Sequence, residues 1–173
     1  MAVHPDVRSL LRESIPQYLK IAEYCVLNSF GYPAAVLLFG ITDTIGSFYR
    51  NNNNFTVNID GKQRHIKKDG HQHFYILNSY YYGLNITENK IINIYNNFRS
   101  TLVHNASMAQ KHFLVSTSGD EPFPIINGDQ CVNLIPLLGL SKCAVALFLA
   151  RIDDIVPLSR QHENIIRKST CKT

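Results

Sequence analysis

Two long apolar stretches constrain the fold of this chain more than any other feature. They cover residues 32–48 and 134–152, and polar residues such as Asp43 and Lys142 interrupt each one too often for a membrane span. The first stretch is apolar nearly all round, which is typical of a central helix in a bundle. The sequence therefore predicts a buried core helix in each stretch, with Pro33 opening the first, and no membrane segment.

A third helix is predicted near the start of the chain. Ser14 has the chemistry of an N-cap and Pro16 would lie in the first turn, after which apolar residues recur at helical spacing to about residue 30. An aromatic-rich segment, residues 73–84, favours a short helix, although a strand is also open. These elements indicate an all-α, or mainly all-α, fold in which four to five helices form an antiparallel bundle.

One β-hairpin is expected inside this bundle, around residues 55–67. Residues 55–59 alternate apolar and polar, Asp60-Gly61 is a strong hairpin turn signal, and residues 64–67 would form the return strand. The polar residues on either side make the whole insert residues 51–70.

The rest of the chain is predicted to belong to one domain covering residues 1–173. At 173 residues the length fits a single domain with a sizeable core. Residues 111–117 and 122–126 leave two alternatives open, a second hairpin or an irregular loop. Residues 156–173 form a polar, basic C-terminal tail.

Composition excludes few function classes. The apolar fraction is 45%, the charged fraction is 17% and the net charge is +4, which permits an acidic partner such as RNA without requiring one. The densest basic run, residues 62–68, favours a solvated hairpin tip over a phosphate track.

Cysteine and histidine positions predict neither a metal nor a cofactor. The four cysteines are not paired at metal-ligand spacing, and free thiols together with the lack of a leader pattern favour the cytoplasm. His71 and His73 have only Asp69 as a nearby ligand, so the sequence does not predict a metal site there.

The candidate catalytic residues lie in one segment of the chain, Tyr95-Asn96-Asn97-Phe98-Arg99-Ser100-Thr101-Leu102-Val103-His104-Asn105. It lies near the end of a predicted amphipathic helix over residues 88–106, which Asn85 or Thr87 would cap. Arg99 can hold a phosphate and His104 can move a proton near neutral pH. Five helical residues correspond to a rotation of roughly 140°, so these two side chains do not stack on one face.

Residues 95–105, read as Tyr-x-x-Phe-Arg-x-x-x-x-His-Asn, resemble the Arg-x(4–6)-His signature of HEPN domains (higher eukaryotes and prokaryotes nucleotide-binding). Residues 32–46, apolar with Asp43 followed by a small residue, resemble the second helix of that family. The resemblance covers about residues 15–106, and the final apolar helix fits the same bundle. The chain departs from the family at Ser100, where Asn, Asp or His is frequent, and in the inserted hairpin.

The resemblance implies a metal-independent endoribonuclease. HEPN domains usually form dimers that bring two Arg–His motifs together near the dyad, and the ribose 2′-OH then attacks the adjacent phosphate. Carried over, His104 would be the general acid or base, and Arg99 would hold the scissile phosphate.

Four further residues would support this site. Ser100 and Asn105 would position the phosphate or orient the histidine, and Asn96 extends the polar stripe formed by Ser100 and His104. Asp43 would orient Arg99 or His104 from the neighbouring helix, or else make a helix-packing hydrogen bond.

The expected partners are an RNA substrate, a second copy of the chain and, in a toxin–antitoxin, stress or phage-defence setting, an antitoxin or regulatory protein. Two alternatives remain open. One is a catalytically inactive HEPN-like module that binds a nucleotide or a protein, and the other is a helical structural protein without a site.

Overall fold

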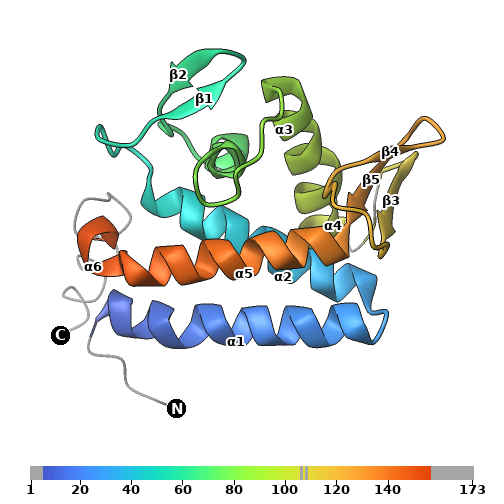
Figure 1. Ribbon diagram of the computed structural model, residues 1–173, viewed down its shortest axis with the longest axis horizontal. Helices are drawn as coiled ribbons and strands as arrows, with labels where there is room; N and C mark the ends of the chain where they lie inside the picture. Colours follow the sequence, from blue (N-terminus) through green and yellow to red (C-terminus); the bar gives the residue numbers. More distant parts are fainter. Residues whose placement is uncertain (1–5, 106, 108, 157–173) are drawn as a thin grey trace.

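Helices make up most of the structure, a computed structural model that describes residues 6–105, 107 and 109–156 (Figure 1). Helix α2 (Gly31–Phe48) contacts both α1 (Val7–Leu27) and α5 (Leu134–Ala150). Figure 1 shows α1 and α5 running side by side. The hairpin, the segment from α3 (Glu88–Ile94) to α4 (Thr101–Asn105) and a small sheet are drawn above α5 in this view. The prediction of a mainly helical fold is confirmed.

Helix α2 provides the centre of the hydrophobic core, as its apolar sequence predicts. Its inward residues are almost completely buried: Ala34, Ala35, Leu38, Phe39, Ile41 and Ile45. Helix α5 begins at Leu134, close to the predicted start, and ends at Ala150, before a short helix α6 (Ile152–Ile155). One continuous cluster of buried apolar side chains joins α1, α2, α5 and α6.

Helix α1 starts earlier than predicted. Asp6 is its N-cap, because its side chain accepts a hydrogen bond from the backbone N–H of Ser9 at 2.8 Å. Pro16 lies inside the helix and not in its first turn. The apolar stripe extends through Val7 and Leu11, and burying these residues outweighs the single backbone hydrogen bond that a proline removes.

The predicted helix over residues 88–106 is helical throughout its described part but is not a regular α-helix. It consists of α3 (Glu88–Ile94), the π-helix η2 (Tyr95–Ser100) and α4 (Thr101–Asn105). Thr87 is the cap, and its hydroxyl accepts a hydrogen bond from the N–H of Lys90 at 3.3 Å.

The predicted hairpin insert is present. Strand β1 (Val57–Ile59) pairs antiparallel with β2 (Lys62–Arg64). Asp60 and Gly61 have φ values of 51° and 74°, the left-handed pair that a tight type I′ turn requires. The return strand therefore starts directly after the turn, two residues before the expected position.

A three-stranded sheet replaces the alternatives of a second hairpin or a loop. Strands β3 (His112–Val115) and β4 (Ile125–Ile126) do not pair with each other, because each pairs with β5 (Asp129–Asn133). The turn between β4 and β5 is Asn127-Gly128, again with two positive φ values, 54° and 85°. An all-α description is therefore too narrow, since the helices are accompanied by two small sheets.

The aromatic segment forms a 3₁₀-helix, η1 (Gly70–Asn78), which packs against α2. This element is shifted toward the N-terminus from the predicted residues 73–84. The predicted C-terminal tail lies outside the described residues from position 157 onward.

Candidate functional site

Arg99 is held in place by an ion pair with α2. Its Nη2 donates a hydrogen bond to Oδ2 of Asp43 at 2.5 Å, and its guanidinium lies over the ring of Tyr95 at 5.4 Å from the centroid. The side chains of Arg99 and Asp43 are 22% and 20% exposed. Because the pair is largely buried, it is screened less by solvent than a surface pair would be.

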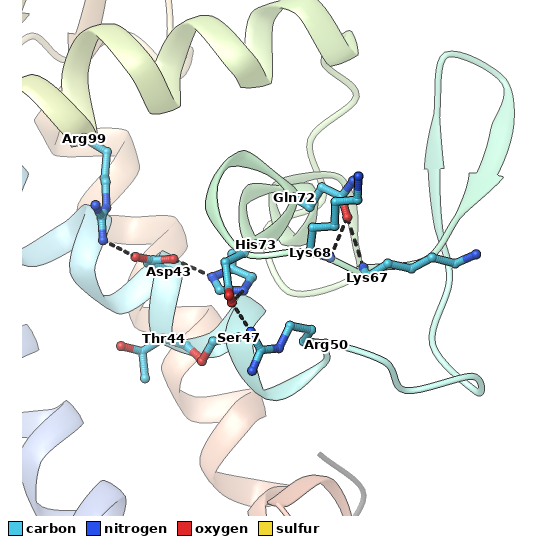
Figure 2. Close-up of polar contacts among 10 residues, drawn as sticks. Asp43, Thr44, Ser47, Arg50, Lys67, Lys68, Gln72, His73 and Arg99 are labelled. Carbon is cyan, nitrogen blue, oxygen red and sulfur yellow. Dashed lines mark hydrogen bonds and ion pairs between the residues drawn. The ribbon is translucent and has the colours of Figure 1, made fainter. Parts of the chain in front are cut away.

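Asp43 also binds a histidine from a third element. His73, on η1, donates a hydrogen bond from Nδ1 to Oδ1 of Asp43 at 2.7 Å, since a carboxylate can only accept. Figure 2 shows Asp43 between Arg99 and His73. The Nε2 atom of His73 lies 3.4 Å from a carboxylate oxygen of Asp69, which in turn binds Arg50. A row of polar and charged side chains, Arg99, Asp43 and His73, thus connects η2, α2 and η1.

The two partners keep Asp43 ionised. Burial alone would raise the pKa of the Asp43 carboxyl group, but the hydrogen bond from His73 and the positive charge of Arg99 outweigh it. The resulting pKa is below the ordinary value for aspartate, so the carboxylate is charged at neutral pH.

A glycine on α2 brings η1 close enough for this contact. A Cβ atom at Gly46 would lie 2.0 Å from the carbonyl oxygen of His73, a distance that no side chain permits. Gly46 is one helical turn after Asp43, so both residues face η1. The absence of a side chain at Gly46 therefore sets the position of His73 relative to the carboxylate.

His104 lies in a different environment. It is exposed, in the last turn of α4, and it makes no hydrogen bond or ion pair within the described part of the chain. Arg99 lies in the π-helix, which ends at Ser100, and His104 lies in the α-helical turn that follows it. At this junction Thr101 donates hydrogen bonds to the carbonyls of Asn97 and Phe98, at 2.6 and 3.2 Å. These bonds stabilise an irregular turn of a kind that is frequent at functional sites.

The remaining predicted residues have separate positions. Asn96 is exposed and Ser100 is half-buried, while the side chain of Asn105 lies outside the described residues. Asp43 was expected to orient Arg99 or His104, and in the structure it contacts Arg99. His73 was considered in the sequence only as half of a metal-binding pair, and the Asp69-x-x-x-His73 spacing was its available signal.

An apolar groove lies beside the Arg–His segment. Its volume is about 520 Å³, and it is lined by Tyr32, Pro33, Val36 and Leu37 of α2 and by Leu102 of α4. Val103, the residue before His104, is 47% exposed. An apolar surface of this kind, next to polar groups, is typical of a protein-interaction site.

Two searches of the described residues gave negative results. Within residues 6–105, 107 and 109–156, no group of three or more His, Cys, Asp or Glu side chains is arranged to bind a metal ion. None of the helices in this part of the chain combines the length and the apolar character needed to cross a membrane.

The chain was compared with protein-family models, with curated proteins and with solved structures, and none of them matches it. The interpretation of the site therefore depends on its own geometry.

Proposed function

We propose that this protein is a HEPN-like, metal-independent endoribonuclease in which Arg99 and His104 act on RNA at a dimer interface. One observation carries the proposal: the same short helical segment presents a guanidinium fixed by Asp43 and an exposed imidazole without a protein partner among the described residues. A fixed cation suits phosphate binding, and a solvent-exposed imidazole suits proton transfer.

Arg99 retains a donor for a phosphate. Its guanidinium has five N–H groups, and the bond to Asp43 uses Nη2. The Nη1 group makes no hydrogen bond with another described residue, and the side chain as a whole is 22% exposed. In this proposal Nη1 stabilises the negative charge that grows on the phosphate oxygens.

His104 performs the proton transfers in the proposed reaction. The ribose 2′-oxygen forms a bond to phosphorus as the bond from phosphorus to the 5′-oxygen breaks, giving a 2′,3′-cyclic phosphate. A neutral imidazole accepts the 2′-OH proton, and a protonated imidazole donates a proton to the 5′-oxygen. A dimer supplies both forms, one from each copy of His104.

The groove beside α4 is the proposed dimer surface. Its apolar lining, together with the exposed Val103 and Tyr32, would be covered by a second copy, bringing the two His104 side chains close to the dyad. We expect Val103→Glu to convert the dimer to a monomer in sedimentation velocity. Leu10→Glu, at an exposed apolar residue on α1, should leave the dimer intact.

A second candidate function is favoured by the same ion pair. In this alternative Asp43 neutralises Arg99 and the pair has the structural role of holding α2 against η2, as in a catalytically inactive HEPN-like module that binds a nucleotide or a protein.

RNA cleavage distinguishes the two candidates. The purified protein is incubated in EDTA with a mixed RNA ladder, beside His104→Ala and Arg99→Ala variants. The nuclease proposal expects cyclic-phosphate products from the wild type and none from either variant. Cleavage that survives in both variants would refute the site, and an inactive wild type would favour the binding module.

A further inference from the structure

A cavity of about 280 Å³ lies where the loop between α2 and β1, the segment after η1 and the junction of α5 with α6 meet. In Figure 1 this junction is at the α6 end of α5, away from α4. No residue assigned to the proposed cleavage lines the cavity. Phe55 and Ile155 are buried side chains of its lining, and Tyr80 is half-exposed. The volume is just below the range of drug-sized sites, so the cavity suits a small ligand.

Aromatic side chains and a closed loop fix the walls of this cavity. The rings of Tyr49 and Phe55 stack with centroids 3.9 Å apart, and Tyr80 lies edge-on to Phe55 at 6.3 Å. The hydroxyl groups of Tyr49 and Tyr80 are 3.3 Å apart, within hydrogen-bond distance. The backbone N–H of Phe55 donates to the carbonyl of Asn52 at 3.3 Å. A preformed cavity of this kind lowers the entropic cost of binding.

Two exposed side chains of opposite charge belong to the same lining. Arg151 and Asp154 are one helical turn apart, and the N–H of Asp154 donates to the carbonyl of Arg151 at 3.0 Å. Nη1 of Arg151 donates to the hydroxyl of Tyr80 at 2.6 Å, and the guanidinium lies 5.7 Å from the centroid of that ring. Among the described residues neither Arg151 nor Asp154 forms an ion pair, whereas the adjacent Asp153 pairs with Arg12 at 2.6 Å.

The tyrosines beside Arg151 do not neutralise its charge. Burial raises the pKa of Tyr49 and also that of Tyr81, whose hydroxyl is hydrogen-bonded to Tyr49. Both hydroxyl groups are therefore uncharged at neutral pH. The cavity combines apolar walls with one cationic and one acidic side chain.

This combination disfavours ligands that carry a single charge. Asp154 repels a simple anion, and Arg151 repels a simple cation. An uncharged apolar molecule would remove water from both groups without replacing it. A zwitterion satisfies both, because a guanidinium donates two parallel N–H bonds to a carboxylate and a carboxylate accepts from an ammonium group.

We infer that the cavity binds a free α-amino acid with an apolar side chain. Its carboxylate binds Arg151, its ammonium group binds Asp154, and its side chain packs against Phe55 and Ile155. This inference does not rest on the proposed cleavage, because no residue assigned to that reaction takes part.

The first test measures binding to the full-length protein by calorimetry and by amide chemical shifts. The ligands are leucine, methionine and phenylalanine. Isocaproate, which is leucine without its amino group, and isoamylamine, which is leucine without its carboxylate, serve as matched controls. We expect saturable binding of at least one amino acid, shifts at Tyr80 and Ile155, and binding of both controls at least tenfold weaker than that of leucine.

Two pairs of variants locate the site. Asp154→Asn should weaken amino-acid binding by about tenfold and strengthen binding of isocaproate, whereas Asp153→Asn, outside the lining, should bind as the wild type does. Arg151→Gln should also weaken amino-acid binding by about tenfold, while Lys142→Gln, at an exposed cation of α5 outside the lining, should not.

Three results would overturn the inference: no amino-acid binding at millimolar concentration, binding of either control as tight as that of leucine, or unchanged affinity in both Asp154→Asn and Arg151→Gln. If a variant does not fold, as judged by circular dichroism, the comparison of leucine with its two controls on the wild type still decides. Because RNA cleavage is not measured, failure here leaves the nuclease proposal standing, and the reverse also holds.

Discussion

The two ends of the Arg99–His104 segment differ in how the protein surrounds them. Arg99 is largely buried and is bound to Asp43, which His73 holds from the other side. His104 is exposed and has no partner within the described residues. This contrast matches the two roles in the proposed reaction, where a group that holds charge in a fixed place needs neighbours and a group that exchanges protons with a substrate needs access. Changes at the two ends should therefore have different consequences.

The largest expected effect is on activity, at the exposed end. We expect His104→Ala to lower RNA cleavage by roughly 10²- to 10⁴-fold, the usual contribution of a general acid or base. The free energy of unfolding of this variant should change by less than about 0.5 kcal/mol, because His104 is exposed and makes no hydrogen bond or ion pair with another described residue. Single-turnover cleavage and urea unfolding measure the two quantities. A large loss of stability would show that His104 is a structural residue.

The largest expected effect on stability is at the buried end. Gly46→Ala places a methyl group 2.0 Å from the carbonyl of His73 and should destabilise the protein by about 3 kcal/mol, at or above the upper end of overpacking costs. Gly40 on the same helix has open space around it, so Gly40→Ala should be neutral or stabilise by about 0.5–1 kcal/mol through helix propensity. Thermal unfolding of both variants checks this difference, and equal melting temperatures would contradict the close approach of η1.

The same contrast explains what could be predicted from the sequence. The core helices were predictable because their apolar residues are numerous and polar or proline-containing segments separate them clearly. For Asp43, a contact with either Arg99 or His104 was expected, and the structure shows the contact with Arg99. The π-helix was not predictable, since an α-helix and a π-helix bury Phe98 and Leu102 with the same apolar pattern. His73 was missed because its partner is 30 residues away and depends on a glycine whose importance is visible only in three dimensions.

The three-stranded sheet was difficult for a related reason. Its parallel pair, β3 with β5, joins segments that are not adjacent in the sequence, and β4 has only two residues. The Asn127-Gly128 turn signal was present, but strands this short have too little alternation to support it. Sequence patterns within one segment predict pairing between neighbouring strands, whereas this sheet depends on the pairing of β3 with β5 across the intervening chain.

The contribution of the Asp43–Arg99 pair to stability should be lost only at acidic pH and should be constant near neutral pH. The pKa of Asp43 is lower in the folded protein than its ordinary value of 3.8, so ionised Asp43 stabilises the fold above that value. This contribution is lost as the pH falls through the folded-state pKa. Asp43→Asn should reduce stability at pH 7 by roughly 1–3 kcal/mol, because Arg99 loses its partner, and should flatten the dependence of stability on pH below 4. Identical pH profiles for variant and wild type would show that Asp43 is not coupled to the fold.

The smallest expected effect tests whether His73 holds the carboxylate that orients Arg99. An asparagine at this position has its amide nitrogen near the place of Nδ1, whereas the longer glutamine places it near Nε2, toward Asp69. We expect His73→Asn to keep cleavage within about threefold of the wild type and His73→Gln to lower it by about tenfold, the equivalent of one hydrogen bond. The decrease should be in kcat, since Arg99 would still bind the phosphate but would hold it less well oriented. Equal losses in both variants, accompanied by equal losses of stability, would mean that His73 only fills space between α2 and η1. In that case the fixed position of Arg99 would depend on Asp43 and on the close contact at Gly46 alone.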